Sequence, residues 1–294
     1  MKTLFVVLAV AVCFSAYAAT DVRSGAWTAE VDGDSLQMSV FPRSNDHDHA
    51  RFGGNVMGFD EPIASFRGLS KDDVAASAAN VRFEMDRPAG TIVFEGRFAD
   101  GTAAGHFRFT PDDAFLRDMD TLGYHGFSDE QLLMFAVNDF SPQTIRDLRA
   151  MGYQLTIREL DEIAAFRITA ELIRDYARLG YPNLTMREVV NFRVGRVDAD
   201  YINGMRALGY PNLSAHELAE SAILGVRPAY VRELQTAGLT GLSAKELRDL
   251  RIGRITAARI EEYRKLGYDH LTAKQLINMG IFGVTPEYIR SLIR

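Results

Sequence analysis

The chain has 294 residues, of which 47% are hydrophobic and 24% charged, and its 33 basic and 39 acidic residues give a net charge of −6. This balance excludes a strongly basic protein that would attract nucleic acid through its overall charge. The composition excludes a low-complexity or disordered chain. The length allows two domains that each bury a hydrophobic core.

Residues 1–18 have the pattern of a secretory signal peptide. Lys2 precedes the apolar run TLFVVLAVAVCF, and small residues follow, with Ala16-Tyr17-Ala18 as a cleavage pattern. The run is too short to span a bilayer, and the alternative interpretation is a buried N-terminal strand. We therefore expect an exported protein, periplasmic or secreted, that is cleaved near Ala18. Cleavage would remove Cys13, the only cysteine, and leave a chain without disulfides or transmembrane segments.

Residues 19–110 combine β-branched and aromatic residues with regular turn signals, which predicts a small antiparallel β module. The turns DRPAG at 86–90 and ADGT at 99–102 make the last three strands consecutive hairpins. One helix is expected at 69–78, and a polar, glycine-rich loop lies between it and the second strand. The expected strands are WTAEV, LQMSV, VRFEM, TIVFEGRF and AGHFRF.

From residue 111 onward the sequence is helical and repeats itself. LGYPNLT at 179–185 returns as LGYPNLS at 208–214, and the aligned Ser or Thr residues are spaced by 28, 29, 29, 29 and 29 residues. A fixed period of this length is typical of helical hairpins that stack to bury both faces. The aligned residues are Ser128, Thr156, Thr185, Ser214, Ser243 and Thr272.

The repeated phrase predicts where helices end and begin. A glycine ends one helix in the left-handed conformation, and the Ser or Thr begins the next, with Gln or Glu three residues later as a capping box. A second helix should begin 13 residues after the first cap, where Arg227 alone replaces a capping Ser, Thr or Asp. Gly204 lies inside a helix, where we expect alanine to be tolerated. The terminating glycines are Gly123, Gly152, Gly180, Gly209, Gly238 and Gly267.

These patterns predict an α+β protein with two domains. A small antiparallel β module at 19–110 is followed, at 111–294, by an α-solenoid of about six 29-residue hairpins, or about 13 short helices.

The sequence holds little that points to catalysis. It lacks the H-E-x-x-H, G-x-S-x-G, P-loop and G-x-G-x-x-G motifs, so we expect no enzyme and no cofactor. His47 and His49 in NDHDH are weak candidates for a metal site, because a secure zinc site needs three or four converging ligands; the simpler interpretation is a solvated loop. A nucleic-acid-binding repeat protein is a further alternative, but residues 122–294 hold 22 basic and 21 acidic residues, which largely cancel.

The run VRFEMDRPAGTIVFEGRFADGTAAGHFRFTPDDAF, followed by phrases such as LGY and VTPEYIR, resembles bacterial exported proteins in which a β module precedes short helical repeats. In some of these proteins the repeats form the extracytoplasmic part of antibiotic-sensing membrane metallopeptidases. This sequence has neither the metallopeptidase motif nor membrane helices. The resemblance therefore implies an extracytoplasmic accessory or sensing module and identifies no catalytic residue.

Two phrases, RVGR at 193–196 and RIGR at 251–254, occupy the same phase two repeats apart, near the end of the first helix. A cation in the last turn of a helix complements its dipole, which is the structural interpretation. The functional interpretation is that Arg193, Arg196, Arg251 and Arg254 form two basic stations for an extended acidic segment, either of another protein or of the acidic β module.

We therefore predict a non-enzymatic protein-interaction or sensing module with an unidentified protein partner. The alternatives are a small-ligand or envelope-binding β module with the solenoid as spacer, and an undetected hydrolase.

Overall fold

The computed structural model describes residues 23–43 and 56–292. These residues form two compact units, each described below by itself. One unit holds the chain up to Asp112 together with Phe127–Val137, and the other holds Asp113–Gly126 and the chain from Asn138 onward. The predicted signal peptide and the NDHDH segment lie outside the described residues.

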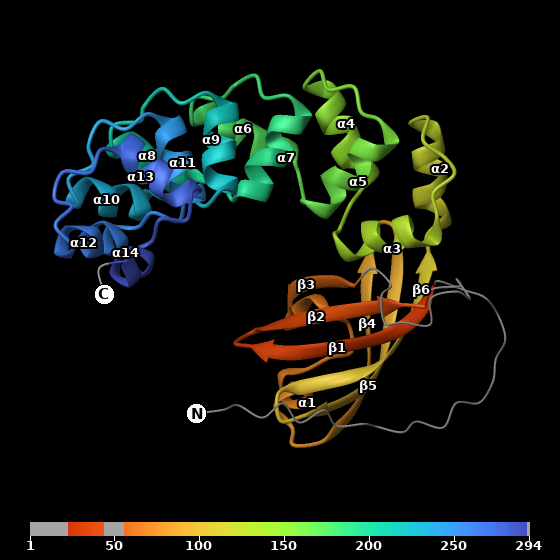
Figure 1. The fold of residues 1–294 in the computed structure, drawn as a ribbon. Helices are drawn as coiled ribbons and strands as arrows, with labels where there is room; N and C mark the ends of the chain where they lie inside the picture. The colour runs from red at the N-terminus through yellow and green to blue at the C-terminus, as the bar shows by residue number, and fades with distance from the viewer. Residues whose placement is uncertain (1–22, 44–55, 293–294) are drawn as a thin grey trace, which may run out of the picture. The chain divides into compact units, whose positions relative to one another are not determined.

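The first unit is a curled six-stranded antiparallel sheet in the order β3-β2-β1-β6-β5-β4 (Figure 1). The predicted hairpins of the last three strands are confirmed. β3 was not predicted, because MGFDEP is short and rich in residues that are rare in strands; its pairing with β2 creates it. The elements are β1 (Ser24–Asp32), β2 (Ser35–Pro42), β3 (Met57–Pro62), η1 (Ile63–Ser65), α1 (Lys71–Ala75), β4 (Ala79–Arg87), β5 (Gly90–Ala99) and β6 (Thr102–Pro111).

Trp27 occupies the centre of this sheet's core. Its ring is fully buried, with ring centroids 5.4 Å from Phe83 and 5.7 Å from Phe94. The indole Nε1 donates to two backbone carbonyls, of Glu95 at 3.2 Å and His106 at 3.1 Å. Gly96 leaves room for the ring, because a Cβ there would lie 2.8 Å from Trp27 Cζ2. The core therefore depends on a glycine on one strand and a tryptophan on another.

An ion pair joins the two strands at opposite edges of the sheet order. Arg87 Nη2 on β4 lies 2.8 Å from Glu61 Oε2 on β3, and the two side chains are 15% and 9% exposed. The curl of the sheet brings these edge strands to one another. Pairing compensates two charges that would each be costly to bury alone.

Helix α3 (Asp129–Val137) belongs to the sheet unit, although its capping box places it in the repeat pattern. It packs on β3, β5 and β6. Leu133, Phe135 and Ala136 are fully buried, and Asp129 pairs with Arg23 at 3.1 Å. A helix on the surface of a protein usually buries residues on one face only, whereas α3 buries consecutive residues. This packing on three strands is the reason that α3 belongs to the sheet unit.

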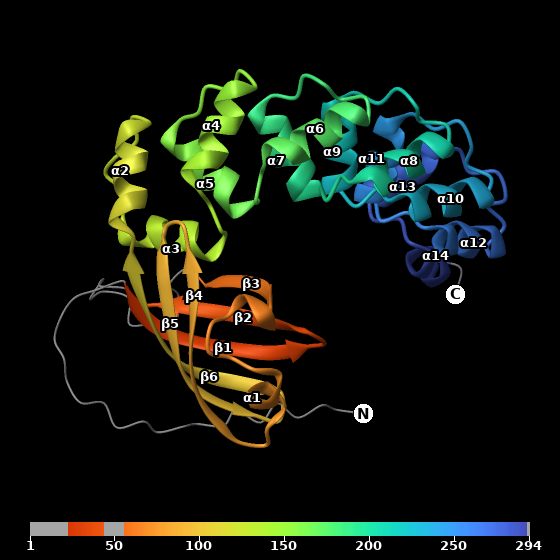
Figure 2. The same cartoon turned by 180° about the vertical axis from the view of Figure 1, so that it is seen from behind.

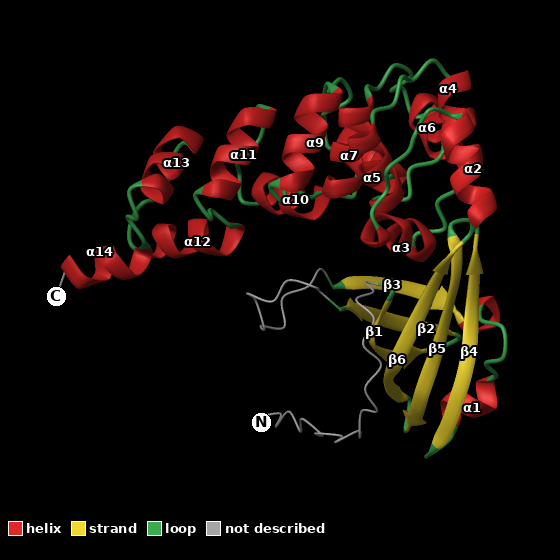
Figure 3. Cartoon of the chain, turned by 90° about the vertical axis from the view of Figure 1, so that its right-hand side faces the viewer, coloured by secondary structure: helices red, strands yellow, loops and turns green. Residues whose placement is uncertain are grey.

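Twelve further helices stack as hairpins, and with α3 they make the 13 helices from α2 to α14 of the described chain, which confirms the helical-repeat architecture. From α7 onward the first helices of the hairpins stand in one row and the second helices in another (Figures 2 and 3). The helices are α2 (Asp113–Thr121), α4 (Pro142–Ala150), α5 (Ile157–Ala165), α6 (Ala170–Arg178), α7 (Met186–Gly195), α8 (Ala199–Ala207), α9 (Ala215–Ile223), α10 (Pro228–Thr236), α11 (Ala244–Ile252), α12 (Ala257–Lys265), α13 (Ala273–Ile281) and α14 (Pro286–Leu292).

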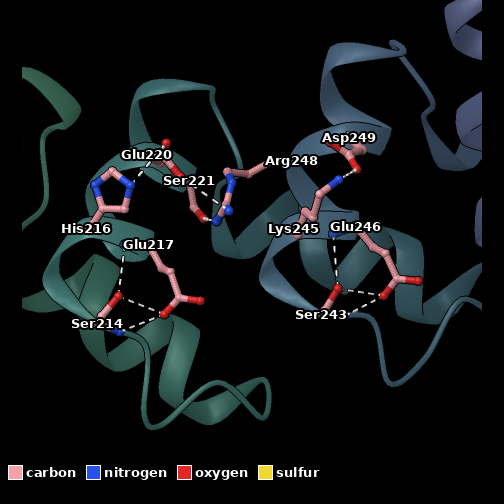
Figure 4. A network of polar contacts seen from close by, with 10 residues as sticks. All are labelled: Ser214, His216, Glu217, Glu220, Ser221, Ser243, Lys245, Glu246, Arg248 and Asp249. Atoms are coloured by element: carbon pink, nitrogen blue, oxygen red, sulfur yellow. Dashed lines mark hydrogen bonds and ion pairs between the residues drawn. The ribbon is translucent and has the colours of Figure 1, made fainter.

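The helix ends follow the repeated phrase. All six terminating glycines have positive φ, from 86° at Gly123 to 98° at Gly209. Each aligned Ser or Thr accepts from the backbone N–H three residues on, and the side chain of that residue accepts from the cap in return. Figure 4 shows two of these boxes, Ser214 with Glu217 and Ser243 with Glu246. Hydrogen bonds from the serines lower the pKa of both glutamates.

Two series of tyrosines tie each hairpin to the next. Tyr153, after its terminating glycine, donates its hydroxyl to the Leu184 carbonyl at 2.6 Å, and Tyr124, Tyr181 and Tyr210 repeat the bond. In the second helices Tyr201 donates to Val226, and burial raises the pKa of Tyr201 to about 12. No local pattern of residues shows which carbonyl such a hydroxyl reaches, so the sequence does not predict these bonds.

We expect Glu61→Ala to destabilise the sheet unit by about 3–5 kcal/mol, because it leaves the Arg87 cation buried without its carboxylate. Trp27 is the only tryptophan, so its fluorescence during denaturant unfolding reports this unit. Lys71→Ala is the control: it removes an exposed pair with Asp34 and should cost within about 0.5 kcal/mol. Equal effects of the two substitutions would contradict this role of the pair.

The structure reverses the expectation for Gly204. A Cβ at this position in α8 would lie 2.8 Å from Pro228 Cγ in the next hairpin. We expect Gly204→Ala to destabilise the helical unit by about 1 kcal/mol or more, measured by circular dichroism in denaturant. The control is Asn203→Ala at the exposed neighbouring position, which should be neutral or slightly stabilising. A Gly204→Ala variant as stable as the parent would restore the original expectation.

Gly209 has a φ of 98° and open space around it. Gly209→Val should therefore cost ~1–2 kcal/mol from backbone strain alone.

Candidate functional site

The first helices of the hairpins do not stack evenly. α7 approaches α9, and α11 approaches α13, more closely than α9 approaches α11. At the close contacts a Cβ on Gly195 would lie 3.0 Å from Ala222 Cβ, and one on Gly280 would lie 2.6 Å from the Gly253 carbonyl oxygen. Small residues therefore allow two close helix pairs, α7–α9 and α11–α13.

Arginines fill the wider contacts, α5–α7 and α9–α11, that precede each close pair. Arg193 Nε donates to the Phe166 carbonyl at the end of α5, at 2.9 Å. Arg251 lies beside Gly225 at the end of α9, and its Cζ is 5.0 Å from the Tyr230 ring centroid. Arg248 also reaches from α11 to Glu220 at 3.3 Å (Figure 4). Arg193 and Arg251 thus bridge successive repeats, where the other repeats have alanine or glycine.

Arg196 and Arg254 adopt left-handed backbone conformations, with φ of 51° and 54°. The equivalent position is left-handed in every hairpin: Gly225 and Gly283 adopt this conformation at little cost, and Asp139 and Arg167 have φ of 56° and 48°. For an L-residue the conformation costs roughly 1–2 kcal/mol. Both arginines are exposed, and neither guanidinium makes an ion pair or hydrogen bond within the described residues. Strain kept at an exposed residue favours a use for its side chain.

The ends of the first helices are strongly basic, unlike the repeats as a whole. From α5 to α13 the segments 164–169, 193–198, 222–227, 251–256 and 280–285 contain six arginines and one acidic residue, Asp198. Helix C-termini attract cations through their dipole, but an excess of this size also attracts anionic groups from solution. The arginines are Arg167, Arg193, Arg196, Arg227, Arg251 and Arg254.

Arg193 and Arg196 line a groove of 650 Å³ between α6, α7 and α8. Tyr176 and Phe192 form its apolar part, and Arg178 and Asp175 pair at its rim. Burial raises the pKa of Tyr176, while nearby Arg193 opposes the shift. The same balance at Tyr230, with Arg251 opposing, leaves a pKa of about 12. Both tyrosines therefore stay neutral.

Sequence reasoning missed the role of Arg227, which breaks the capping rule. Its Nη2 donates to the Gly195 carbonyl at 2.9 Å and its Nη1 to the Arg196 carbonyl at 3.4 Å. It therefore satisfies the end of the preceding first helix instead of capping its own helix. An unexpected arginine at a cap position was the available signal.

The other sequence-based candidates add no site. His47 and His49 lie outside the described residues, and within residues 23–43 and 56–292 no group of three or more His, Cys, Asp or Glu is placed to hold a metal. In the same part of the chain no helix is both long and apolar enough to cross a membrane. No protein-family model, curated protein or solved structure matches this chain.

We expect Arg196→Gly and Arg254→Gly each to stabilise the helical unit by up to ~1 kcal/mol, because glycine relieves the left-handed strain. Denaturant unfolding followed by circular dichroism measures the change. Gly283→Arg, at the equivalent open position, should have the opposite effect. Destabilisation by both glycine substitutions would assign the two arginines to holding the fold.

Proposed function

We propose that this is an exported, non-enzymatic interaction protein whose helical repeats bind an acidic segment of a partner protein. The observation that carries the proposal is the pair of exposed, strained arginines, Arg196 and Arg254, within a row of six arginines and one aspartate. Neither guanidinium has a partner among the described residues, so both are available to carboxylates. Stacked repeats provide the extended surface on which such a segment lies.

Export is part of the proposal and rests on the N-terminal sequence. Lys2, the apolar run and Ala16-Tyr17-Ala18 follow the order of a signal peptide. The partner would then be a protein of the cell envelope or its surroundings. The sequence contains no catalytic motif, and a binding role accounts for the two arginines, Arg196 and Arg254, to which the helical unit gives no side-chain partner within the described residues.

Capture from a cell-envelope extract tests the function. The mature chain should retain one or a few proteins, and polyglutamate peptide or raised salt should release them, because screening weakens exposed charge pairs. Arg196→Gly/Arg254→Gly should lose most of this capture while melting no earlier than the parent. The control is the double variant Arg158→Ala/Arg187→Ala, which removes two other exposed arginines and should leave capture unchanged.

Retention of the same proteins by the glycine variant would contradict the proposal. The intact mass of the exported product tests the localisation: a chain beginning within one residue of Ala19 supports it, and a cytoplasmic chain that retains Met1 contradicts it.

A further inference from the structure

An exposed aliphatic residue recurs beside the arginines, at the same phase of four successive hairpins. Val194 and Ile223 are each 48% exposed, Ile252 is 59% exposed and Ile281 is 63% exposed. Leu224 and Phe282, one residue further on in the second and fourth of these hairpins, are also exposed. An aliphatic side chain is expected to be buried, and repeated exposure in one row indicates a contact surface.

This row is divided into two stations of the same chemistry. The α7–α9 station contains two arginines and three apolar residues, and the α11–α13 station contains their counterparts 58 positions later. The first station is Arg193, Val194, Arg196, Ile223 and Leu224, and the second is Arg251, Ile252, Arg254, Ile281 and Phe282.

The close helix contacts hold each station together. Ile223 of α9 lies against Gly195 of α7: a Cβ on this glycine would be 3.4 Å from Ile223 Cγ1. Ile223 is therefore next to Val194 and Arg196, which flank Gly195 in the chain. The backbone contact of Gly253 with Gly280 joins α11 and α13 in the same way. The wider contact between α9 and α11, where Arg251 lies beside Gly225, separates the stations. The repeating unit of this surface is therefore a pair of hairpins.

We propose that the two stations together bind one extended segment carrying two copies of a short motif, a carboxylate followed by an aliphatic residue, about six residues apart. The inference rests on the proposed function and specifies its partner. Charge complementarity selects the carboxylates, since each station offers an exposed guanidinium, Arg196 or Arg254, that makes no ion pair within the described residues. The exposed aliphatic residues select the apolar neighbour. Two hairpin steps of ~10 Å place the stations ~20 Å apart, which about six extended residues at ~3.3 Å each span.

Linking the motifs makes the second contact intramolecular. Each station alone is a small surface and should bind weakly. A segment of matching length should bind about 100-fold more tightly than either motif alone, and a segment too short to span the stations should gain little. An α-helical partner would need ~13 residues for the same distance, since a helix rises ~1.5 Å per residue. Motif spacing thus distinguishes an extended partner from a helical one.

The test uses the mature chain and fluorescein-labelled peptides with one Glu-Ile pair, or with two pairs three, six or thirteen residues apart in a Ser-rich filler, measured by fluorescence anisotropy. We expect the six-residue spacing to bind about 100-fold more tightly than the single pair, and the three-residue spacing to resemble the single pair. Equal binding at all spacings, tightest binding at thirteen, or no binding of any peptide would overturn the inference.

Substitutions locate the contacts. Ile223→Ser in one station or Ile281→Ser in the other should each reduce the six-residue peptide to nearly single-pair affinity, and should lower the melting temperature no more than Ile157→Ser does. Ile157, an exposed isoleucine outside both stations, is the matched control, and its substitution should leave peptide binding unchanged. If Arg196→Gly/Arg254→Gly abolishes envelope capture but Ile223→Ser and Ile281→Ser leave peptide binding intact, the two-station inference fails and the proposed function stands. If the arginine variant also keeps its capture, both fail.

Discussion

Short helices leave nearly half of their backbone hydrogen-bonding groups without a partner inside the helix, and this constraint underlies the whole helical unit. An α-helix has four free N–H groups at one end and four free carbonyls at the other, so a helix of nine residues, such as α9 or α11, consists largely of ends. Isolated helices of this length are not stable in water. The chain meets the constraint locally with capping boxes and left-handed glycines. Between hairpins, side chains of one repeat donate hydrogen bonds to the free carbonyls of a neighbouring repeat.

Tyrosine and arginine make these longer connections. Tyrosine hydroxyls donate forward to the carbonyl before the next helix, as Tyr210 does to Leu242. Arginines donate backward to the end of the preceding helix, as Arg206 does to Leu179 and Arg264 to Ala237. Arg193 makes the same backward bond between first helices, so its position has a structural reason. Arg196 and Arg254 have no such bond within the described residues, and they adopt a backbone conformation that glycine would adopt more cheaply. This contrast separates arginines that build the solenoid from arginines offered to a partner.

The sheet unit meets a different constraint. An open sheet has two edge strands with unpaired backbone groups and an interior that must be filled. Aromatic side chains around Trp27 fill the interior, and the Glu61–Arg87 pair joins the curled edges. α3 packs against the same sheet. The unit is therefore stabilised by contacts between residues far apart in sequence.

Local patterns in the sequence were enough to predict the repeat period, the helix ends, the hairpins of the last three strands and the α+β class. These features depend on a few neighbouring residues: a glycine that permits positive φ, a serine within reach of an N–H three residues on, or turn residues between two strands. The sequence also located the arginines of the candidate site, because RVGR and RIGR differ from the other repeats. Three further features became visible only in the folded chain: β3 exists, α3 packs on the sheet, and Gly204 must remain small beside Pro228. The folded chain also shows that Arg193 and Arg251 lie in wide helix contacts while Gly195 and Gly253 lie in close ones. The physical reason is that these features depend on distances between atoms of different repeats or strands, which no local pattern of residues records.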